Sequence, residues 1–515
     1  MSPSESLAEI TIQRCLEIGI SEFVVCAGSR NSPLVLEVLR HDVQVWSFFE
    51  ERSAAFFALG RCRDSEAPVA VITTSGTAVA ELLPAVIEAT YLRAPLLCIT
   101  GDRPKAFRNS GAPQAIEQAG IFCMYARDSW DVQDDRFDLT RWDGWGPAHL
   151  NICFDDPLLT SGDEKSPAPG KSPTPKPLVE PASKSRHTKF PFAPDLVLLG
   201  AVRRRDRQAV REFLAELGSP ILADATSCLR EAPDLNALML QSGESILSTS
   251  PPSTVLRIGG VPSCRFWRDL ENLPGIQVIS VLSRGFTGLA RKSVMFESLR
   301  SLCFEGTPSP REILKTDRKR IAGFESLLNE FPESEPSLMR SLSERIPAKS
   351  SLFLGNSLPI REWNLAATFE NRQFGVWANR GANGIDGNVS TFLGLTANAA
   401  ESWGIFGDLT TLYDLAAPWI LRELPAKKRR FVVINNGGGK IFSRLPVLGE
   451  LPESTKRITE NTHEIQLEHW AKMWGLSHRS IESNSFPARL PKEVVLEIHP
   501  DSAQTEQFWK EFKQL

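Results

Sequence analysis

Two short segments, Gly407-Asp408-Leu409 and Asn435-Asn436-Gly437-Gly438-Gly439, decide how this chain folds. Each follows an apolar run, Trp403–Phe406 before the first segment and Phe431–Ile434 before the second. The separation of about 27 residues is typical of one βαβ unit, which brings the two turns to the carboxyl ends of neighbouring parallel strands. An ordinary strand, turn and helix with polar loop residues is the alternative interpretation.

The residue types in these two turns favour a site for a metal ion and a phosphate group. Carboxylate, amide and backbone carbonyl oxygens are the ligands that Mg2+ prefers, and a diphosphate can complete its octahedron. The run of glycines allows the backbone to come close to a phosphate, because glycine has no side chain in the way.

Length, charge and cysteine usage exclude several classes of protein. The 515 residues are too many for one core and indicate about three domains. A net charge of −4 gives no electrostatic basis for binding nucleic acid. The nine cysteines contain no C-x-x-C pair, so we expect neither a zinc site nor a disulfide framework, and a cytoplasmic location fits. Residues 1–10 are unlike a signal peptide, and no apolar stretch approaches the ~20 residues of a membrane span, so we expect no membrane insertion.

Apolar runs alternate with helical patterns along most of the chain, and this alternation predicts parallel sheets flanked by helices. The predicted fold class is α/β, with three consecutive parallel-sheet domains. Their expected bounds are 1–160, 195–335 and 336–515. Residues 161–194 are rich in Pro, Lys and Ser, cannot bury a core, and are predicted to form an exposed linker.

Individual elements follow from the same patterns. One helix is predicted after Thr77, with apolar residues from Val79 to Ile87 at helical spacing. Residues 297–335 read as mainly helical and polar. Strands are expected near 22–26, 43–49, 69–73, 96–100, 196–199, 221–223, 255–258, 277–281, 351–354 and 493–498.

Glu51 is a candidate acid–base residue because Glu50-Glu51-Arg52 directly follows the apolar run Val45–Phe49. A carboxylate at a strand end with apolar neighbours has a raised pKa and can share a proton with a ring nitrogen. The alternative is an acid that complements the macrodipole at a helix amino terminus.

Arginines recur in turns where strands end: Arg30, Arg103, Arg361 and Arg380. Arginine binds carboxylates through paired hydrogen bonds, so four of them suggest a substrate with several carboxylates, although solvated surface arginines are the alternative for each. The turn Gly355-Asn356-Ser357 can offer donors to a phosphate. The glycine-punctuated loop 379–387 suggests a close approach to a ligand or a flexible loop.

Together these segments resemble the thiamine-diphosphate enzymes. Asp408 and Asn435-Asn436 look like the cofactor motif of that superfamily, with Leu409 in place of its last glycine, and Glu51 lies where the cofactor-activating glutamate would lie. The resemblance narrows to the 2-succinyl-5-enolpyruvyl-6-hydroxy-3-cyclohexene-1-carboxylate synthase (MenD) family of menaquinone biosynthesis and covers both outer domains in order. The segments that carry it are Ala27–Pro33, Thr73–Ala80, Gly101–Pro104, Gln114–Ile116, Gly355–Leu358, Asn379–Gly387, Gly407–Leu409 and Asn435–Phe442.

The resemblance implies a transferase that uses thiamine diphosphate and Mg2+ or Mn2+. Such an enzyme decarboxylates 2-oxoglutarate and adds the remaining unit to isochorismate in conjugate fashion. In this superfamily the glutamate domain of one chain faces the metal domain of another, which implies a homodimer or homotetramer.

The resemblance also assigns roles to matching positions. Glu51 would hydrogen-bond the aminopyrimidine ring, Ser357 would contact the diphosphate region, and Ile385 would hold the cofactor in its bent shape. The expected metal ligands are Asp408, Asn436 and the Gly438 carbonyl. The expected substrate pocket consists of Ser29, Arg30, Arg103, Gln114, Arg361, Arg380, Ile441 and Phe442. Of the residues named here, those expected to act in catalysis are Glu51, Arg30, Gln114, Arg361 and Arg380.

One departure from the family pattern lies in the pocket: Pro113 stands where the family usually has Asn before the glutamine.

Two other functions stay open at this stage. Another thiamine-diphosphate lyase, such as an acetolactate synthase or a 2-oxo acid decarboxylase, would share Glu51 and Asp408 but has no need of four pocket arginines. A non-enzymatic binding protein could keep the fold, although intact Glu51, Asp408 and Asn436 argue against it.

Overall fold

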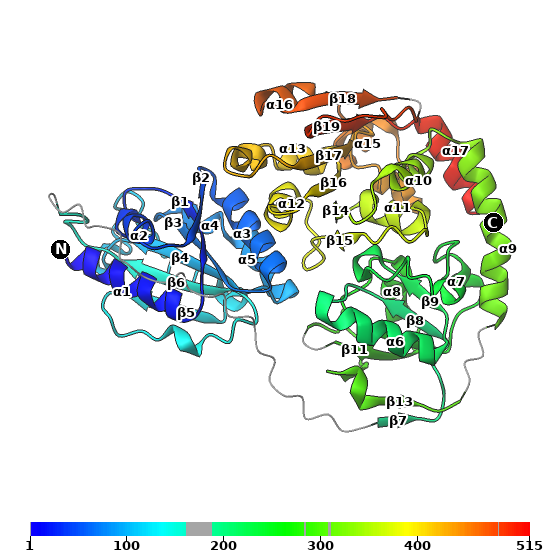
Figure 1. Ribbon diagram of the computed structural model, residues 1–515, viewed down its shortest axis with the longest axis horizontal. Coiled ribbons are helices and arrows are strands. Elements are labelled where there is room, and N and C mark those ends of the chain that lie inside the picture. Colours follow the sequence, from blue (N-terminus) through cyan, green and yellow to red (C-terminus); the bar gives the residue numbers. More distant parts are fainter. Residues whose placement is uncertain (1, 161–187, 283–284, 307–310, 483) are drawn as a thin grey trace. The chain divides into compact units, whose positions relative to one another are not determined.

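The computed structural model describes residues 2–160, 188–282, 285–306, 311–482 and 484–515. It is an α/β fold with three parallel sheets of five or six strands (Figure 1), which confirms the predicted fold class. Most of the predicted linker, residues 161–187, lies outside the described residues. The remainder includes the short strand β7 (Thr188–Phe190).

The first sheet has six parallel strands in the order β2-β1-β3-β4-β6-β5. The inner strands β3, β4 and β6 are buried along their whole length and mostly apolar, as is typical of parallel sheets covered on both faces. The elements in this part of the chain are α1 (Pro3–Glu17), β1 (Glu22–Cys26), α2 (Ser32–Val38), β2 (Gln44–Phe48), α3 (Glu51–Ser65), β3 (Val69–Thr73), α4 (Thr77–Ala80), α5 (Leu83–Leu92), β4 (Leu96–Asp102), β5 (Asp128–Val132) and β6 (Ala148–Cys153).

The second sheet has five parallel strands in the order β12-β11-β10-β8-β9. In the same part of the chain, β7 pairs with β13 in a two-stranded sheet. The elements here are β8 (Leu196–Leu199), α6 (Arg207–Leu217), β9 (Ile221–Ala223), α7 (Ile246–Thr249), β10 (Thr254–Ile258), α8 (Arg265–Asp269), β11 (Gln277–Val281), β12 (Val294–Phe296), β13 (Leu302–Phe304) and α9 (Arg311–Glu330).

The third sheet has six parallel strands in the order β15-β14-β16-β17-β19-β18. The elements in this part of the chain are α10 (Glu335–Arg345), β14 (Ser351–Leu354), α11 (Leu358–Ala366), β15 (Gly375–Trp377), α12 (Asn388–Leu395), β16 (Glu401–Gly407), α13 (Asp408–Tyr413), the 3-10 helix η9 (Ala417–Arg422), β17 (Lys428–Ile434), the 3-10 helix η10 (Phe442–Arg444), α14 (Pro446–Gly449), α15 (Glu453–Thr459), α16 (Glu468–Met473), β18 (Ser477–Ile481), β19 (Glu493–Ile498) and α17 (Ser502–Phe512).

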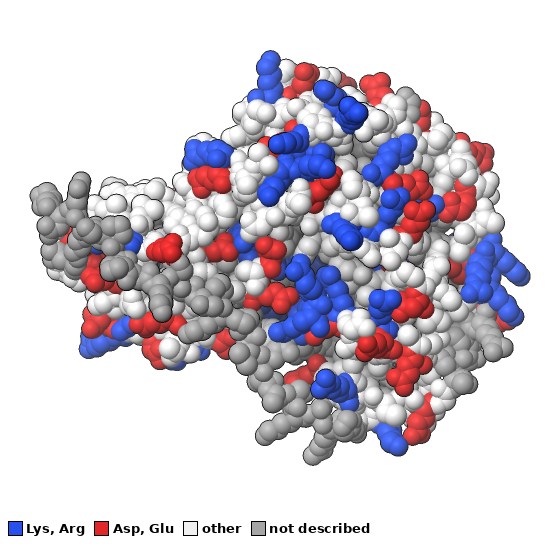
Figure 2. Space-filling view, in the orientation of Figure 1, with Lys and Arg blue, Asp and Glu red and all other residues white. Residues whose placement is uncertain are grey.

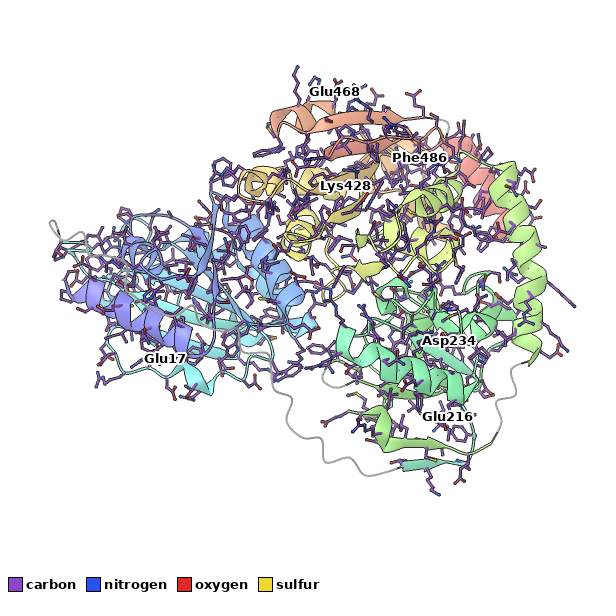
Figure 3. The ribbon with its side chains drawn as sticks, in the orientation of Figure 1. Glu17, Glu216, Asp234, Lys428, Glu468 and Phe486 are labelled. Atoms are coloured by element: carbon purple, nitrogen blue, oxygen red, sulfur yellow. The ribbon has the colours of Figure 1, made fainter. Side chains whose placement is uncertain are left out.

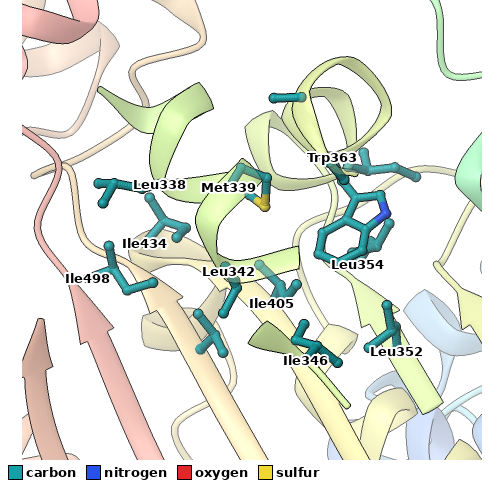
Figure 4. Packing of buried hydrophobic residues seen from close by; sticks show 14 of the residues in the cluster. Leu338, Met339, Leu342, Ile346, Leu352, Leu354, Trp363, Ile405, Ile434 and Ile498 are labelled. Atoms are coloured by element: carbon teal, nitrogen blue, oxygen red, sulfur yellow. The ribbon is translucent and has the colours of Figure 1, made fainter. Parts of the chain in front are cut away.

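Packing of α10 and α11 on the third sheet forms its main core. Leu338, Met339 and Leu342 of α10 lie against Ile434 and Ile498 of the sheet (Figure 4), and all are buried. Burying a side chain of this size contributes about 1.5–3 kcal/mol. This core fixes where α10 begins relative to the carboxyl ends of the strands.

The chain divides into two compact units. The first comprises Met1–Glu180, Gly381–Ala399 and Leu412–Ala426, and the second comprises Pro181–Arg380, Ala400–Thr411 and Lys427–Leu515. The three-domain bounds expected from the sequence stay a prediction.

One of the element predictions was wrong, and another missed a short strand. The helix expected after Thr77 is broken into α4 and α5, because Pro84 has no N–H to donate and its ring clashes with the preceding turn. Residues 297–335 are mainly helical as predicted, because α9 occupies most of them, although Leu302–Phe304 forms the short strand β13.

The surface carries both signs of charge. Acidic and basic side chains are interspersed over the face in Figure 2. Within the described ranges, no helix has the length and apolar character needed to cross a membrane.

Candidate functional site

In the first unit, glycines allow the loops at the carboxyl ends of β1, β3 and β4 to pack tightly. A Cβ on Gly28, after β1, would lie 2.6 Å from the Cβ of Thr74, after β3. A Cβ on Gly101, near the end of β4, would lie 2.9 Å from the Arg30 carbonyl oxygen. The exposed Ser29 and the neighbouring Arg30 therefore lie at the edge where parallel sheets bind ligands.

Gln114 and Arg103 belong to the same edge. A Cβ on Gly76 would lie 3.4 Å from the Gln114 Cα, and Gln114 has a left-handed φ of 57°. The Arg103 Nε donates to the Pro113 carbonyl oxygen at 3.1 Å. Pro113 therefore keeps a backbone contact in this loop, although it has no side-chain amide to offer.

The Arg30 side chain is held at one end of this group. Its Nη1 donates to the Phe154 carbonyl oxygen at 3.2 Å and lies 3.5 Å from the Asp156 carboxylate. Asp156 is largely exposed, so this ion pair is weak, and a carboxylate ligand could replace it.

Glu51 begins α3 at the carboxyl end of β2, and Glu50 performs the capping that was the alternative role for this acidic pair. The Glu50 carboxylate accepts from the backbone N–H groups of Arg52 and Ser53, each at 3.0 Å. Glu51 is half-buried. Burial raises the pKa of the Glu51 carboxyl, and the negative charges of Glu50 and Glu81 raise it further.

Two buried carboxylates hold the loop that contains Ile385. Glu88 accepts from the backbone N–H of Gly381 at 2.7 Å. Asp414 accepts from the N–H of Gly387 at 2.8 Å and of Val389 at 2.9 Å. These contacts fix the half-buried Ile385 just before α12.

In the second unit, the Asp408 and Asn436 turns follow neighbouring parallel strands, as their spacing predicted. Gly407 of β16 pairs with Ile434 of β17, so both strands end at one edge. Lys428, labelled in Figure 3, marks the opposite, amino end of β17. Beyond the carboxyl ends, the Asp408 Oδ2 accepts from the Gly438 N–H at 2.9 Å.

Asp408 and Gly438 are both constrained. The Asp408 Oδ1 accepts from the Leu409 N–H at 2.6 Å. Burial raises the pKa of the Asp408 carboxyl, and the N–H donors oppose this effect. Gly438 has a φ of 135°, and a Cβ there would lie 2.6 Å from the Glu460 carbonyl oxygen, so only glycine fits.

Asn436 supplies the observation that most favours a cation at this edge. Its Nδ2 donates to Glu335 Oε1 at 2.5 Å. Its Oδ1 is buried and has no hydrogen-bond partner among the described residues. An unpaired buried oxygen costs free energy unless a bound group, such as a cation, interacts with it. A carboxylate, a carboxamide and a backbone carbonyl are a donor set that fits Mg2+.

His463 is a neighbour of this site that the sequence did not reveal. Its Nδ1 accepts from the Ile465 N–H at 3.1 Å, so in the neutral ring the proton is on Nε2. That Nε2 lies 3.3 Å from Asp408 Oδ2. Nothing in the sequence around His463 marks it, because only folding brings it to Asp408.

Arg361 and Arg380 extend from the same unit. The Arg361 Nη1 donates to the Ser357 carbonyl oxygen at 2.6 Å, and the Arg380 Nη1 donates to Asn356 Oδ1 at 3.0 Å. Ser357 has a φ of 72° and a ψ of −126°, a conformation normally reserved for glycine. Such strain is concentrated at functional sites.

The surroundings of Arg361 are electropositive. Burial lowers the pKa of its guanidinium, and the positive charges of Arg380, Arg268 and Arg444 lower it further, with Glu244 opposing. Clustered arginines repel one another, so an anion that binds among them relieves the repulsion. Ile441 and the exposed Phe442 lie just before Arg444 in the chain, at the start of η10.

Another group of possible metal ligands, in the first unit, is better explained without a metal. Donor atoms of Asp102, Asp131 and Cys153 lie within 4.8 Å of one another. The Arg108 guanidinium already pairs with both carboxylates, at 3.1 Å and 2.7 Å. The positive charge of Arg108 therefore takes the place of a metal cation beside these two carboxylates.

Comparison with known proteins agrees with this arrangement. Residues 5–121 match the family model described as thiamine pyrophosphate enzyme, N-terminal TPP binding domain. The fold, the acidic start of α3 and the Asp408–Gly438 contact therefore define a thiamine pyrophosphate enzyme.

Curated relatives narrow the class. A 2-succinyl-5-enolpyruvyl-6-hydroxy-3-cyclohexene-1-carboxylate synthase from Bdellovibrio bacteriovorus is 41% identical over 98% of this chain and 98% of the relative. Synthases of the same name are 40% identical in Akkermansia muciniphila, over 98% of both chains, and 34% identical in a Synechococcus species, over 85% of this chain and 83% of the relative. The chain belongs to the 2-succinyl-5-enolpyruvyl-6-hydroxy-3-cyclohexene-1-carboxylate synthase family.

Proposed function

We propose that this protein decarboxylates 2-oxoglutarate and joins the remaining unit to isochorismate in menaquinone biosynthesis, giving 2-succinyl-5-enolpyruvyl-6-hydroxy-3-cyclohexene-1-carboxylate. Family membership supports this reaction. The single structural observation that carries it is the oxygen-rich edge at β16 and β17, where Asp408 contacts Gly438 and the Asn436 Oδ1 has no protein partner in the described residues.

Asp408, Asn436 and the Gly438 carbonyl would hold Mg2+ or Mn2+, and Ser357 would contact the diphosphate of thiamine diphosphate. When bound, thiamine diphosphate supplies the electron sink that allows a 2-oxo acid to lose CO2. Ile385, fixed between the Glu88 and Asp414 contacts, would support the cofactor from its apolar side.

Glu51 would exchange a proton with a ring nitrogen. A carboxyl whose pKa is raised by burial is suited to that task, because it binds a proton more readily than an exposed carboxyl does.

Six polar residues would bind the substrates: Ser29, Arg30, Arg103, Gln114, Arg361 and Arg380. The arginines would fix carboxylates and displace water, so that the reacting carbon is joined to the second substrate and not protonated. Ile441 and Phe442 would form an apolar wall.

The electropositive surroundings of Arg361 favour this reaction over that of an acetolactate synthase or a 2-oxo acid decarboxylase. An acetolactate synthase, or a decarboxylase of a 2-oxo acid with one carboxylate, has no need of several pocket arginines. 2-Oxoglutarate and isochorismate each carry two carboxylates, which matches a cluster of several arginines. We further propose that the protein acts in the cytoplasm as a homodimer or homotetramer.

The test is the loss of isochorismate absorbance with purified protein, thiamine diphosphate, Mg2+ and 2-oxoglutarate, with each omitted in turn. The proposal expects loss only when all are present. Release of CO2 from some 2-oxo acid without loss of isochorismate would contradict it and identify another thiamine-diphosphate lyase.

A further inference from the structure

A buried carboxylate controls which way the Asn436 carboxamide points. The amide Nδ2 of Asn436 donates to Glu335 Oε1 at 2.5 Å. An ionised carboxylate only accepts hydrogen bonds, so the amide must present its N–H2 to Glu335. The Asn436 Oδ1 then faces the other way, where it is buried without a partner in the described part of the chain.

Glu335 is held as an acceptor by a neighbouring arginine. Its second oxygen, Oε2, accepts from the Arg444 Nη2 at 2.7 Å, and the same Nη2 donates to Glu362 Oε1 at 2.6 Å. The Arg444 guanidinium lies over the Trp509 ring, 4.4 Å from its centroid. Burial and the charge of Glu335 raise the pKa of the Glu362 carboxyl well above its usual value, and this carboxyl also hydrogen-bonds the Glu335 side chain.

The backbone of Glu335 is also fixed. Glu335 is the first residue of α10, and its N–H donates to Thr505 Oγ1 at 3.1 Å. The helix packs through Leu338 and Leu342 onto the strands that end beside Asn436 (Figure 4). The carboxylate is therefore delivered by a rigid element, as a positioning contact needs.

We propose that Glu335 is a positioning residue that locks the Asn436 carboxamide with Oδ1, and not Nδ2, towards the divalent cation. The inference rests on the proposed function, because it takes Asn436 as a metal ligand. A partner of this kind typically changes metal affinity by about 10–100-fold.

Glu335→Gln tests the orientation directly. The Arg444 guanidinium has only donors, so it should attract the oxygen of the introduced amide in a charge-assisted bond and leave the N–H2 of that amide facing Asn436. Asn436 would then turn its oxygen towards that N–H2 and away from the metal. We expect Mg2+ to bind at least about tenfold more weakly, measured as quenching of tryptophan fluorescence with thiamine diphosphate and as free Mn2+ by electron paramagnetic resonance.

The double variant Glu335→Gln/Asn436→Asp tests the same contact if the single variant folds poorly. It exchanges the carboxylate and the amide, so the hydrogen bond and the net charge are preserved. The introduced carboxylate can accept from the introduced amide with one oxygen and bind the metal with the other. We expect Asn436→Asp alone to bind Mn2+ weakly, because its carboxylate would face Glu335, and the double variant to recover affinity. Melting without metal shows whether each variant is folded.

The matched control is Glu362→Gln, at a side chain that contacts Arg444 and Glu335 but is not the acceptor for the Asn436 amide. The introduced amide can still accept from Arg444 and donate to Glu335. This variant should keep the wild-type Mg2+ affinity. Wild-type affinity in Glu335→Gln, or a double variant no better than Asn436→Asp, would overturn the role of Glu335. A wild-type protein that binds neither Mg2+ nor Mn2+ would instead overturn the proposed metal site.

Discussion

Arg361 and Arg380 are the residues on which substrate choice should depend most. One charge-assisted contact is worth about 1.5–3 kcal/mol, so Arg361→Ala and Arg380→Ala should each lower kcat/KM roughly ten- to a hundredfold. Steady-state kinetics with 2-oxoglutarate and isochorismate would measure the loss.

Arg211→Ala is the matched control for these arginines. Its guanidinium also pairs with a carboxylate, 2.8 Å from Asp234, which is labelled in Figure 3, but both side chains are exposed to solvent. A surface pair of this kind contributes little, so activity should be unchanged. Equal effects of Arg211→Ala and Arg361→Ala would contradict a specific role for Arg361.

Asp414 should make stability depend on pH. Burial raises the pKa of its carboxyl to about 7, although the Gly387 and Val389 N–H groups oppose the effect. Between about pH 4 and pH 7 the folded protein therefore keeps a proton that the unfolded chain has released. Stability then falls as pH rises through this window, by at most about 1.4 kcal/mol per pH unit.

Asp414→Asn should flatten this slope, because an amide does not titrate. Urea unfolding at several pH values would compare the slopes, and Glu216→Gln, on an exposed residue labelled in Figure 3, is the control. The slopes, and not the absolute stabilities, are compared. The introduced amide also loses one acceptor for the backbone N–H groups, which changes stability at every pH. An unchanged slope would mean that Asp414 does not titrate in this range.

At the residue scale, the sequence predicted contacts that depend on strand order and missed those that depend on packing. The turns that begin at Asp408 and Asn435 were expected together because adjacent parallel strands end side by side. Glu335 and His463 could not be placed, because they reach the site from elements whose positions relative to β16 and β17 follow from helix docking and loop folding. No local sequence pattern indicates where a helix or loop docks on the sheet.

Among the elements, buried strands were the easiest to predict. β3, β8, β11 and β19 match their apolar runs residue for residue, since parallel strands buried on both faces are almost continuously hydrophobic. β13 was missed because three residues give no periodicity and its partner, β7, is more than a hundred residues away in the chain. Pairing over that distance is a tertiary effect.

The crossing of α3 and α12 depends on two glycines that face each other. A Cβ on Gly394 would lie 2.2 Å from the Phe57 carbonyl oxygen and 3.1 Å from the Gly60 Cα. Gly394→Ala should therefore destabilise the protein by about 1–3 kcal/mol through overpacking. The melting temperature and the urea midpoint would measure this.

Gly275→Ala is the control for that crossing, because a Cβ there would meet nothing within 4 Å. It should leave the melting temperature nearly unchanged. If Gly394→Ala and Gly275→Ala behaved alike, the helices would have room to separate, and close approach at this crossing would not be a requirement of the fold.

For the whole molecule, the decisive question is whether Glu51 and Asp408 of one active site come from the same chain. They lie in different compact units. The family resemblance implies that the glutamate of one chain serves the metal residues of another. Glu51→Gln and Asp408→Ala should each be inactive alone, yet a coexpressed mixture should recover activity, because a mixed dimer then contains one site with both residues intact.

Random pairing makes half of the dimers mixed, each with one intact site of two, so the mixture should show roughly a quarter of wild-type activity. Two affinity tags would isolate the mixed dimer, and light scattering would give its mass. The control is coexpression of Glu51→Gln with the double variant Glu51→Gln/Asp408→Ala, where no dimer has an intact glutamate and no activity should return. Inactive mixed dimers would place each site within one chain, and a monomeric wild-type protein would contradict self-association altogether.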